Sequence, residues 1–188
     1  MRGLDSEKEQ RILDSTSDII MTQGIAAVSL SKIAQQAHIA SGTLYTYFKD
    51  KDDMLRSLYL NRKTKLAQAI TQFDVHGDPK TELGHFMDLV YQYGQTHFDD
   101  LMLIREFNQA PILNQLQISK TEAYSGFERL AIFVDHGVTT GAFVDINAQI
   151  LMAYAYTPVV EYLIASKNQT IEAPFSQIKW LSERAVLK

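Results

Sequence analysis

The stretch SGTLYTYFKDKDDM, Ser41 to Met54, combines tyrosines, threonines and lysines within one short segment. Read as a β-strand, it has no face that is cleanly apolar, so alternation fits poorly. Read as a helix, it places Leu44 and Phe48 four residues apart on a core-facing side, while Thr43 and Tyr47 share a polar, aromatic side. The pattern therefore predicts a short helix that presents its second side to a partner.

Helical spacing continues along almost the whole chain. Ser6 and Glu9 have the spacing of a capping box, Gly24 is typical of a helix end, and Ser29 and Asp50 are typical N-caps. The later helices are expected at about 79–97, 99–109, 113–136, 145–167 and 174–187, with Pro158 kinking or dividing the helix that contains it. About nine helices and no convincing strand predict an all-α fold.

Composition excludes several classes of protein. The 188 residues include no cysteine, which rules out disulfides, thiol catalysis and cysteine-based zinc sites. No apolar run is long enough to span a membrane and no secretory signal is visible, so a cytoplasmic protein without a membrane partner is expected. Residues 1–65 carry 10 Lys and Arg against 8 Asp and Glu, whereas residues 66–188 carry 8 against 14. This asymmetry favours a nucleic-acid partner for the N-terminal third, although an ordinary solvated surface explains so small an excess equally well.

Residues 29–48 have the spacing of a helix-turn-helix, in which the second helix enters the major groove of DNA. With only Leu44 and Phe48 as deep anchors, the second helix is free to turn its other side chains outward, namely Ser41, Thr43, Tyr45 and Tyr47. Lys51 begins the next helix, where its ammonium and the backbone amides can meet a phosphate. The alternative interpretation is that Tyr45 and Tyr47 pack under the N-terminal helix of the chain, which is expected between Ser6 and Gly24.

The segment VSLSKIAQQAHIASGTLYTYFKDKDDML, residues 28–55, resembles the signature of the TetR (tetracycline-repressor) family of bacterial transcriptional regulators. The match lies in Ile33-Ala34, Gly42-Thr43-Leu44-Tyr45, Tyr47-Phe48, Lys51 and the acidic pair before Met54-Leu55, and it extends over about residues 6–66. The resemblance implies a helix-turn-helix domain over residues 1–50 and a helical effector-binding and dimerisation domain over residues 51–188. It further implies a homodimer on a palindromic operator.

By position, the resemblance implies phosphate contacts from Ser29, Tyr47 and Lys51, and groove-facing positions at Ser31, Ser41, Gly42, Thr43 and Tyr45. The chain also departs from the family pattern. Ala40 replaces the usual cap residue, so Ser41 is expected to cap the recognition helix, and Lys32 adds phosphate attraction where an acidic residue is common. Ser31 and Ser41 replace basic or amide side chains, which leaves fewer bidentate base contacts.

The acidic two-thirds is expected to hold a small-molecule pocket among apolar and polar side chains, although such residues at helical spacing are also typical of a core. The candidate pocket residues are Met87, Tyr91, His97, Met102, Arg105, Phe107, Tyr124 and Phe127. The segment 146–166 is apolar on nearly every side, which predicts either a dimer interface or a central core helix. The candidate interface residues, including two from the last helix, are Met152, Tyr156, Val159, Leu163, Ile178 and Leu181.

No catalytic or metal-binding pattern stands out. The five histidines, at positions 38, 76, 85, 97 and 136, are never three or four residues apart, and no phosphate loop or nucleophile elbow is present. We therefore expect no metal, no cofactor and no enzyme activity. The favoured hypothesis is a DNA-binding repressor released by a small-molecule effector; the alternatives are the same regulator controlled by a protein partner, and an α-helical enzyme or carrier with a helix-turn-helix.

Overall fold

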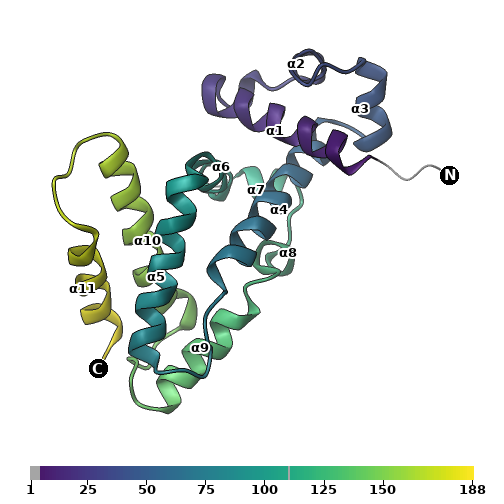
Figure 1. Ribbon diagram of the computed structural model, residues 1–188. Coiled ribbons are helices and arrows are strands. Elements are labelled where there is room, and N and C mark those ends of the chain that lie inside the picture. Colours follow the sequence, from purple (N-terminus) through teal and green to yellow (C-terminus); the bar gives the residue numbers. More distant parts are fainter. Residues whose placement is uncertain (1–4, 110) are drawn as a thin grey trace. The chain divides into compact units, whose positions relative to one another are not determined.

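The computed structural model describes residues 5–109 and 111–188 and confirms the all-α fold. Its helices follow one another along the chain as Figure 1 shows. They are α1 (Ser6–Gln23), the short 3₁₀ helix η1 (Ile25–Ala27), α2 (Leu30–Gln36), α3 (Ser41–Tyr47), α4 (Lys51–Ile70), α5 (Pro79–Thr96), α6 (Phe98–Asn108), α7 (Ile112–Gln115), α8 (Lys120–Tyr124), α9 (Glu128–Thr139), α10 (Ala148–Lys167) and α11 (Phe175–Val186).

The described residues form two compact units. The first contains residues 5–63, 99–109 and 111–123, and the second contains residues 64–98 and 124–188. The division falls inside α4, and the beginning of this helix and most of α6 group with the helix-turn-helix. The domain boundary expected after residue 50 stays a prediction. The two units are described separately below.

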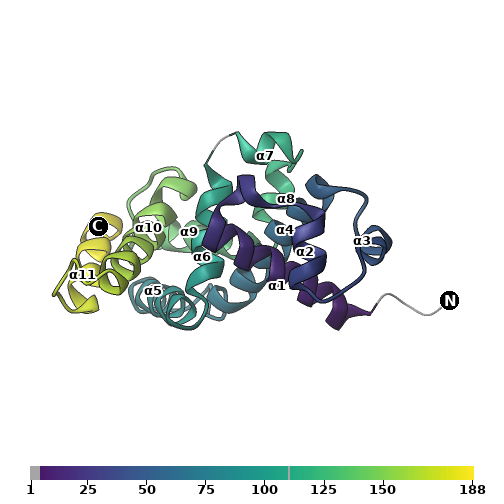
Figure 2. The ribbon, with the colours of Figure 1, turned by 90° about the horizontal axis from the view of Figure 1, so that it is seen from above.

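In the first unit, α1 packs against α2 and contacts the start of α4. Ile12, Ile19 and Leu58 are fully buried, and the Thr16 hydroxyl, also buried, lies 3.6 Å from the Met54 sulfur. Figure 2 shows α3 beside α2 at the edge of this unit. The apolar stripe of α1 is thus buried, and α2 packs against this helix.

A buried ion-pair network joins three helices of the first unit. Arg62 of α4 is only 3% exposed, and its guanidinium lies 2.6 Å from the Asp14 carboxylate of α1 and 2.8 Å from the Asp100 carboxylate of α6. A buried cation without such partners would cost several kcal/mol. The two carboxylates therefore fix the relative positions of α1, α4 and α6.

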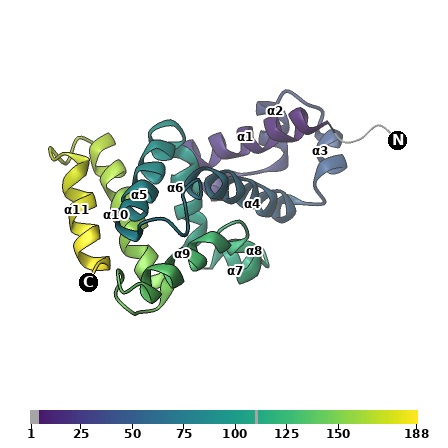
Figure 3. The same ribbon diagram turned by 60° about the horizontal axis from the view of Figure 1, so that its bottom comes forward.

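In the second unit, α10 packs against α5, α9 and α11 (Figure 3). Phe133 contacts both Phe73 and Phe143 edge to face, with ring centroids 5.0 and 5.2 Å away. Phe143 also lies directly against Gly137 of α9, where an added Cβ would be 2.1 Å from the ring. These contacts pin the segment after α9 to the core of the unit.

Two local predictions were wrong, and a third was wrong in part. The helix expected over 113–136 is three shorter helices, because Gln117 and Gly126 adopt positive φ angles that interrupt it. α10 is not divided at Pro158, since burial of its flanking residues outweighs one lost backbone hydrogen bond, and the kink named as the other outcome stays a prediction. The first helix is capped by the Asp5 carboxylate, which accepts from the amides of Glu7 and Lys8, rather than by Ser6.

Other predicted helix ends are confirmed. Gly24 ends α1 with φ +82°, the Ser29 hydroxyl caps α2, and the Asp50 carboxylate accepts from the Asp53 amide at the start of α4. Within the described residues, no helix is both long and apolar enough to cross a membrane.

Gly137→Ala should destabilise the protein by about 2–4 kcal/mol, because the new methyl group cannot fit beside the Phe143 ring. Gly84→Ala in α5 is the matched control: its added Cβ would have no neighbour nearer than 3.6 Å. The control should be stabilised by about 0.5–1 kcal/mol through better helix propensity. Urea unfolding measures both, and equal midpoints for the two variants would contradict the packing described for Gly137.

Candidate DNA-binding interface

The recognition helix α3 is held by two side chains. Leu44 is 1% exposed and Phe48 is 4% exposed, as their spacing predicts. The helix has only seven residues, and its N-cap is Ala40, which offers no side-chain acceptor; the expected cap from Ser41 is wrong, since Ser41 is already helical. A helix this short is not stable alone in water, so α3 depends on these two anchors.

The opposite side of α3 faces away from the first unit. Tyr45 is 61% exposed, Ser41, Gly42 and Thr46 are also exposed, and Thr43 is half-buried. Tyr47 is half-buried with its ring 6.3 Å from that of Phe48. The interpretation in which Tyr45 packs under α1 is therefore wrong. α3 presents a contiguous polar and aromatic face. The groove-facing roles of these side chains stay predictions.

Neither the backbone conformation nor the packing of the chain requires a glycine at position 42. Its φ is not positive, and a Cβ added there would meet nothing within 4 Å. Near a helix N-terminus, glycine is less favourable than alanine by up to about 1 kcal/mol. A bare backbone on an exposed recognition helix is what close approach of another molecule requires.

The turn between α3 and α4 is closed by reciprocal capping. The Asp50 carboxylate accepts from the Asp53 amide at 2.8 Å, and the Asp53 carboxylate accepts from the Lys49 amide at 2.9 Å. Asp53 is thus part of the turn as well as a complement to the helix dipole. This arrangement sets where Lys51 and the free amides of the first turn of α4 point.

The first helix of the motif is also organised at its N-terminus. The Ser29 hydroxyl accepts from the Lys32 amide at 3.3 Å, and the Lys32 ammonium donates to the Gln23 side-chain carbonyl at 3.0 Å. Sequence reasoning missed Gln23, because it lies at the end of α1, nine residues before Lys32. Ser31 is exposed on the same helix.

The predicted effector residues divide between the two units. In the first, Phe107 is fully buried and stacks on Tyr59 at 5.6 Å, Met102 is half-buried and Arg105 is exposed. In the second, Met87 is fully buried and Tyr91 stacks on Phe175 at 4.2 Å. The ring of His97 stacks on Tyr93, Tyr124 is exposed, and Phe127 precedes α9 as its N-cap. Phe107 and Met87 are thus core side chains, and the pocket itself stays a prediction.

A further candidate in the first unit escaped sequence analysis. Burial lowers the pKa of the Lys63 ammonium from its usual 10.5 to about 8. A lysine kept at this cost is a candidate binding residue. No sequence signal distinguishes it from its neighbour Arg62, because the burial arises from tertiary packing.

Most predicted interface residues on α10 face inward. Met152, Val159 and Leu163 are buried inside the second unit, which contradicts their assignment to a dimer surface, and Tyr156 and Ile178 are half-buried. Leu181 is 58% exposed, as an interface residue should be. The exposed apolar side chains on α10 and α11 are Ile150, Tyr154, Trp180 and Leu181. Since the segment is apolar on every side, its sequence could not show which side the subunit covers.

Among the described residues, no group of three or more His, Asp and Glu side chains is placed to hold a metal ion. His76 and His136 do come together, with ring centroids 5.6 Å apart, although they are distant in sequence.

Comparison with known proteins confirms the resemblance seen in the sequence. Residues 12–58 match the model of the family described as bacterial regulatory proteins, tetR family. The fatty acid metabolism regulator protein of Bacillus subtilis is 33% identical over 114 residues, which cover 61% of this chain and 54% of that protein. The transcriptional regulator AcrR of Shigella flexneri is 29% identical over 79 residues, covering 41% of this chain and 37% of its own. The chain thus spans about half the length of the first relative and less than half the length of the second.

Solved structures share the fold over nearly the whole chain. A TetR-family transcription regulator from Marinobacter aquaeolei superposes with a TM-score of 0.87 at 20% identity, and the match covers 100% of both chains. The fatty acid degradation regulator FadR from Bacillus halodurans gives a TM-score of 0.71 at 19% identity, covering 94% of this chain and 93% of its own. At these identities the likeness shows the fold alone, an all-α architecture that begins with a helix-turn-helix.

Gly42→Ala separates stability from binding at this interface. The variant should unfold at a denaturant concentration equal to or higher than that of the wild type, because the methyl group meets no neighbour and favours the helix. Its affinity for specific duplex DNA should fall at least tenfold, because the methyl group blocks close approach. Fluorescence anisotropy and urea unfolding measure the two effects, and unchanged affinity would show that Gly42 lies outside the contact.

Proposed function

We propose that this chain, whose residues 12–58 match the TetR family's model and whose fold is shared with solved members, is a transcriptional regulator that binds DNA as a homodimer in the cytoplasm and is released by a small molecule. The observation that carries the proposal is the exposed face of α3, anchored by Leu44 and Phe48 and centred on Tyr45. That face is polar and aromatic, and it has no role in the core of its own unit.

The chemistry of this face suits the major groove. Thr43 offers a hydroxyl and a methyl group, and Tyr45 offers an aromatic edge and a hydroxyl, both suited to base edges. The Lys51 ammonium and the amides that begin α4 suit a phosphate, and the Asp50–Asp53 capping holds them in place. Two such helices in a symmetric dimer would read half-sites one helical turn, about 34–36 Å, apart.

The test uses a duplex selected from a random library by the wild-type protein. Tyr45→Ala should weaken binding at least tenfold and relax the preferred sequence, because it removes an exposed contact without opening the core. Lys51→Ala should weaken binding to every sequence and flatten the slope of log K against log salt by about one unit per subunit.

Lys8→Ala, in the first turns of α1, is the matched control and should leave both quantities near the wild-type values. The assignment of α3 to the groove fails if Tyr45→Ala keeps full affinity and sequence preference. An unaltered salt slope for Lys51→Ala would remove this residue from the phosphate contacts.

The second copy is proposed to dock on the exposed apolar surface of α10 and α11, formed by Ile150, Tyr154, Trp180 and Leu181. Exposure of four large apolar side chains to water is unfavourable. Burying each of them at an interface would contribute about 1.5–3 kcal/mol. Trp180 is flanked by Arg184, whose guanidinium lies 5.3 Å from the indole ring, so the patch has a polar rim. A symmetric copy presents the same patch and can cover it.

Trp180→Glu should convert the dimer into a monomer, because two carboxylates would be buried at the symmetric contact. Ile132→Glu on α9 is the matched control, since Ile132 is also exposed but lies on another helix. Sedimentation velocity distinguishes the two outcomes. A Trp180→Glu protein that stays dimeric, or a wild type that is monomeric at micromolar concentration, would place the interface elsewhere.

The effector is proposed to be an anionic amphiphile. Lys63 is a candidate contact for the negative head group, because its ammonium is half-buried and would attract an anion. Two proteins similar to this chain are named for fatty acid metabolism and fatty acid degradation. The buried Arg62 network offers a route for the response, since it ties α6 and α1 to the same side chain of α4.

Oleate should release the selected duplex, and oleyl alcohol of the same chain length should do so at least tenfold less well. Lys63→Met should remove that difference, because it replaces the ammonium with an apolar side chain of similar length. Lys65→Met, two residues further along α4, is the control and should keep the wild-type preference. Equal responses of the wild type to oleate and oleyl alcohol would contradict a charged effector, while leaving DNA binding itself intact.

A further inference from the structure

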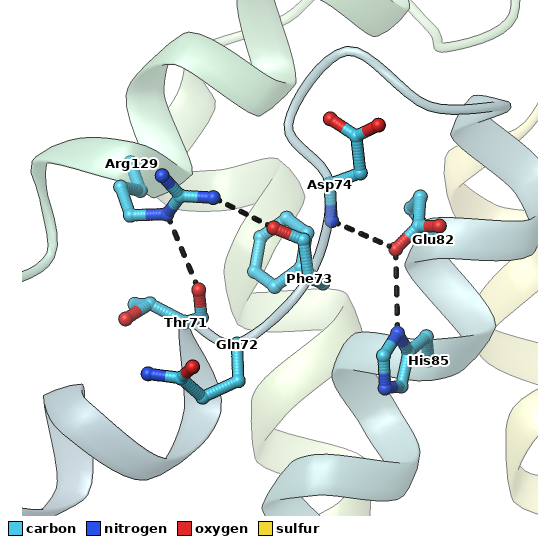
Figure 4. Close-up of a pocket in the computed structure, with 7 residues that line it drawn as sticks. All are labelled: Thr71, Gln72, Phe73, Asp74, Glu82, His85 and Arg129. Carbon is cyan, nitrogen blue, oxygen red and sulfur yellow. Dashed lines mark hydrogen bonds and ion pairs between the residues drawn. The ribbon is translucent and has the colours of Figure 1, made fainter.

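The second unit contains a polar pocket beside the segment that connects α4 to α5. Its volume is about 540 Å³, and it is open to solvent, since Gln72, Asp74, His85 and Arg129 are all exposed. Figure 4 shows its walls: Arg129 reaches in from α9 on one side, and Asp74, Glu82 and His85 lie on the other. Phe73 lies between them, and Gln72 adds an amide. None of these residues belongs to the proposed DNA interface or to the predicted effector residues.

Arg129 is held rigidly by backbone oxygens. Its Nε donates to the Thr71 carbonyl at 3.2 Å, and its Nη2 donates to the Phe73 carbonyl at 2.7 Å. No described carboxylate forms an ion pair with this guanidinium, so its charge is balanced only by dipoles. Its remaining N–H groups, including both on Nη1, donate to no residue that the structure describes. A guanidinium fixed in this way is pre-organised to receive a carboxylate.

The opposite wall is negative. One Glu82 oxygen accepts from the Asp74 amide at 3.1 Å and lies 3.3 Å from Nδ1 of His85. One Asp74 oxygen accepts from the His76 amide at 3.0 Å. The second oxygen of Asp74 accepts no hydrogen bond from a described residue, and Nε2 of His85 has no such partner either. This wall therefore offers acceptors to a cationic or donor group.

We propose that this pocket binds a small zwitterion of amino-acid size, with its carboxylate on Arg129 and its ammonium on Asp74 and Glu82. A simple anion would meet Arg129 but face two carboxylates, and a simple cation would meet the carboxylates but face a fixed guanidinium. Only a ligand that carries both charges complements both walls. The ligand would also bridge α9 to the residues that directly follow α4, so it would hold that end of the helix.

The test is isothermal titration calorimetry on the full-length protein without DNA. The probes are glycine, β-alanine and γ-aminobutyrate, which separate the two charges by increasing distances, and acetate and methylammonium, which carry one charge each. At least one zwitterion should bind saturably with a Kd below about 1 mM, and acetate and methylammonium should each bind at least tenfold more weakly.

Arg129→Gln and Asp74→Asn should each weaken binding of that zwitterion at least tenfold. Lys80→Gln and Asp135→Asn change the same charges at exposed positions outside the pocket and should leave the Kd unchanged. Because Arg129 also bonds the carbonyls after α4, thermal melting is recorded for each variant; if Arg129→Gln unfolds, Asp74→Asn, which keeps those bonds, decides the result.

The proposal is overturned if no zwitterion gives saturable heat, if the single-charge probes bind as well, or if the control variants weaken binding equally. Since the measurement contains no DNA, its failure would leave the proposed regulator function standing, and loss of operator binding would leave this site standing.

Discussion

The burial of Leu44 and Phe48 is the constraint on which the functional surface depends. α3 has seven residues and no side-chain N-cap, so its helical conformation persists only because these two side chains are removed from water. Full burial of two such side chains contributes about 1.5–3 kcal/mol each. Because both anchors lie on one side, every other side chain of α3 is directed by them, and Tyr45 is left in solvent.

Two adjacent residues of α4 show different solutions to charge burial. Arg62 is buried and satisfied by the carboxylates of Asp14 and Asp100, so its charge stabilises one arrangement of three helices. Burial instead lowers the pKa of the neighbouring Lys63 to about 8. The first is a structural cation, whereas the perturbed pKa of the second marks it as a candidate binding residue. Two adjacent residues of α4 thus provide a structural ion pair and a candidate contact for the effector.

Much of the first unit could be predicted from sequence because its signals are local. Gly24, Ser29 and Asp50 act through atoms a few residues away, and the spacing of Leu44 and Phe48 requires only helical geometry. Some predictions failed locally, because Asp5 rather than Ser6 is the N-cap of α1 and Ala40 rather than Ser41 is the N-cap of α3. The spacing of polar and apolar residues over 113–136 is helical throughout. The helix is nevertheless interrupted at Gln117 and Gly126, where the φ angles are positive.

The sequence by itself determined that the chain is all-α and that a short helix with two anchors and an exposed polar face follows a tight turn. These features depend on contacts within about twenty residues. Only the tertiary structure decided which side of α10 is covered, that Lys63 is desolvated, and that Arg129 meets the end of α4. The physical reason is that burial and charge pairing depend on partners brought together by packing, and the pattern of one helix does not specify its neighbours.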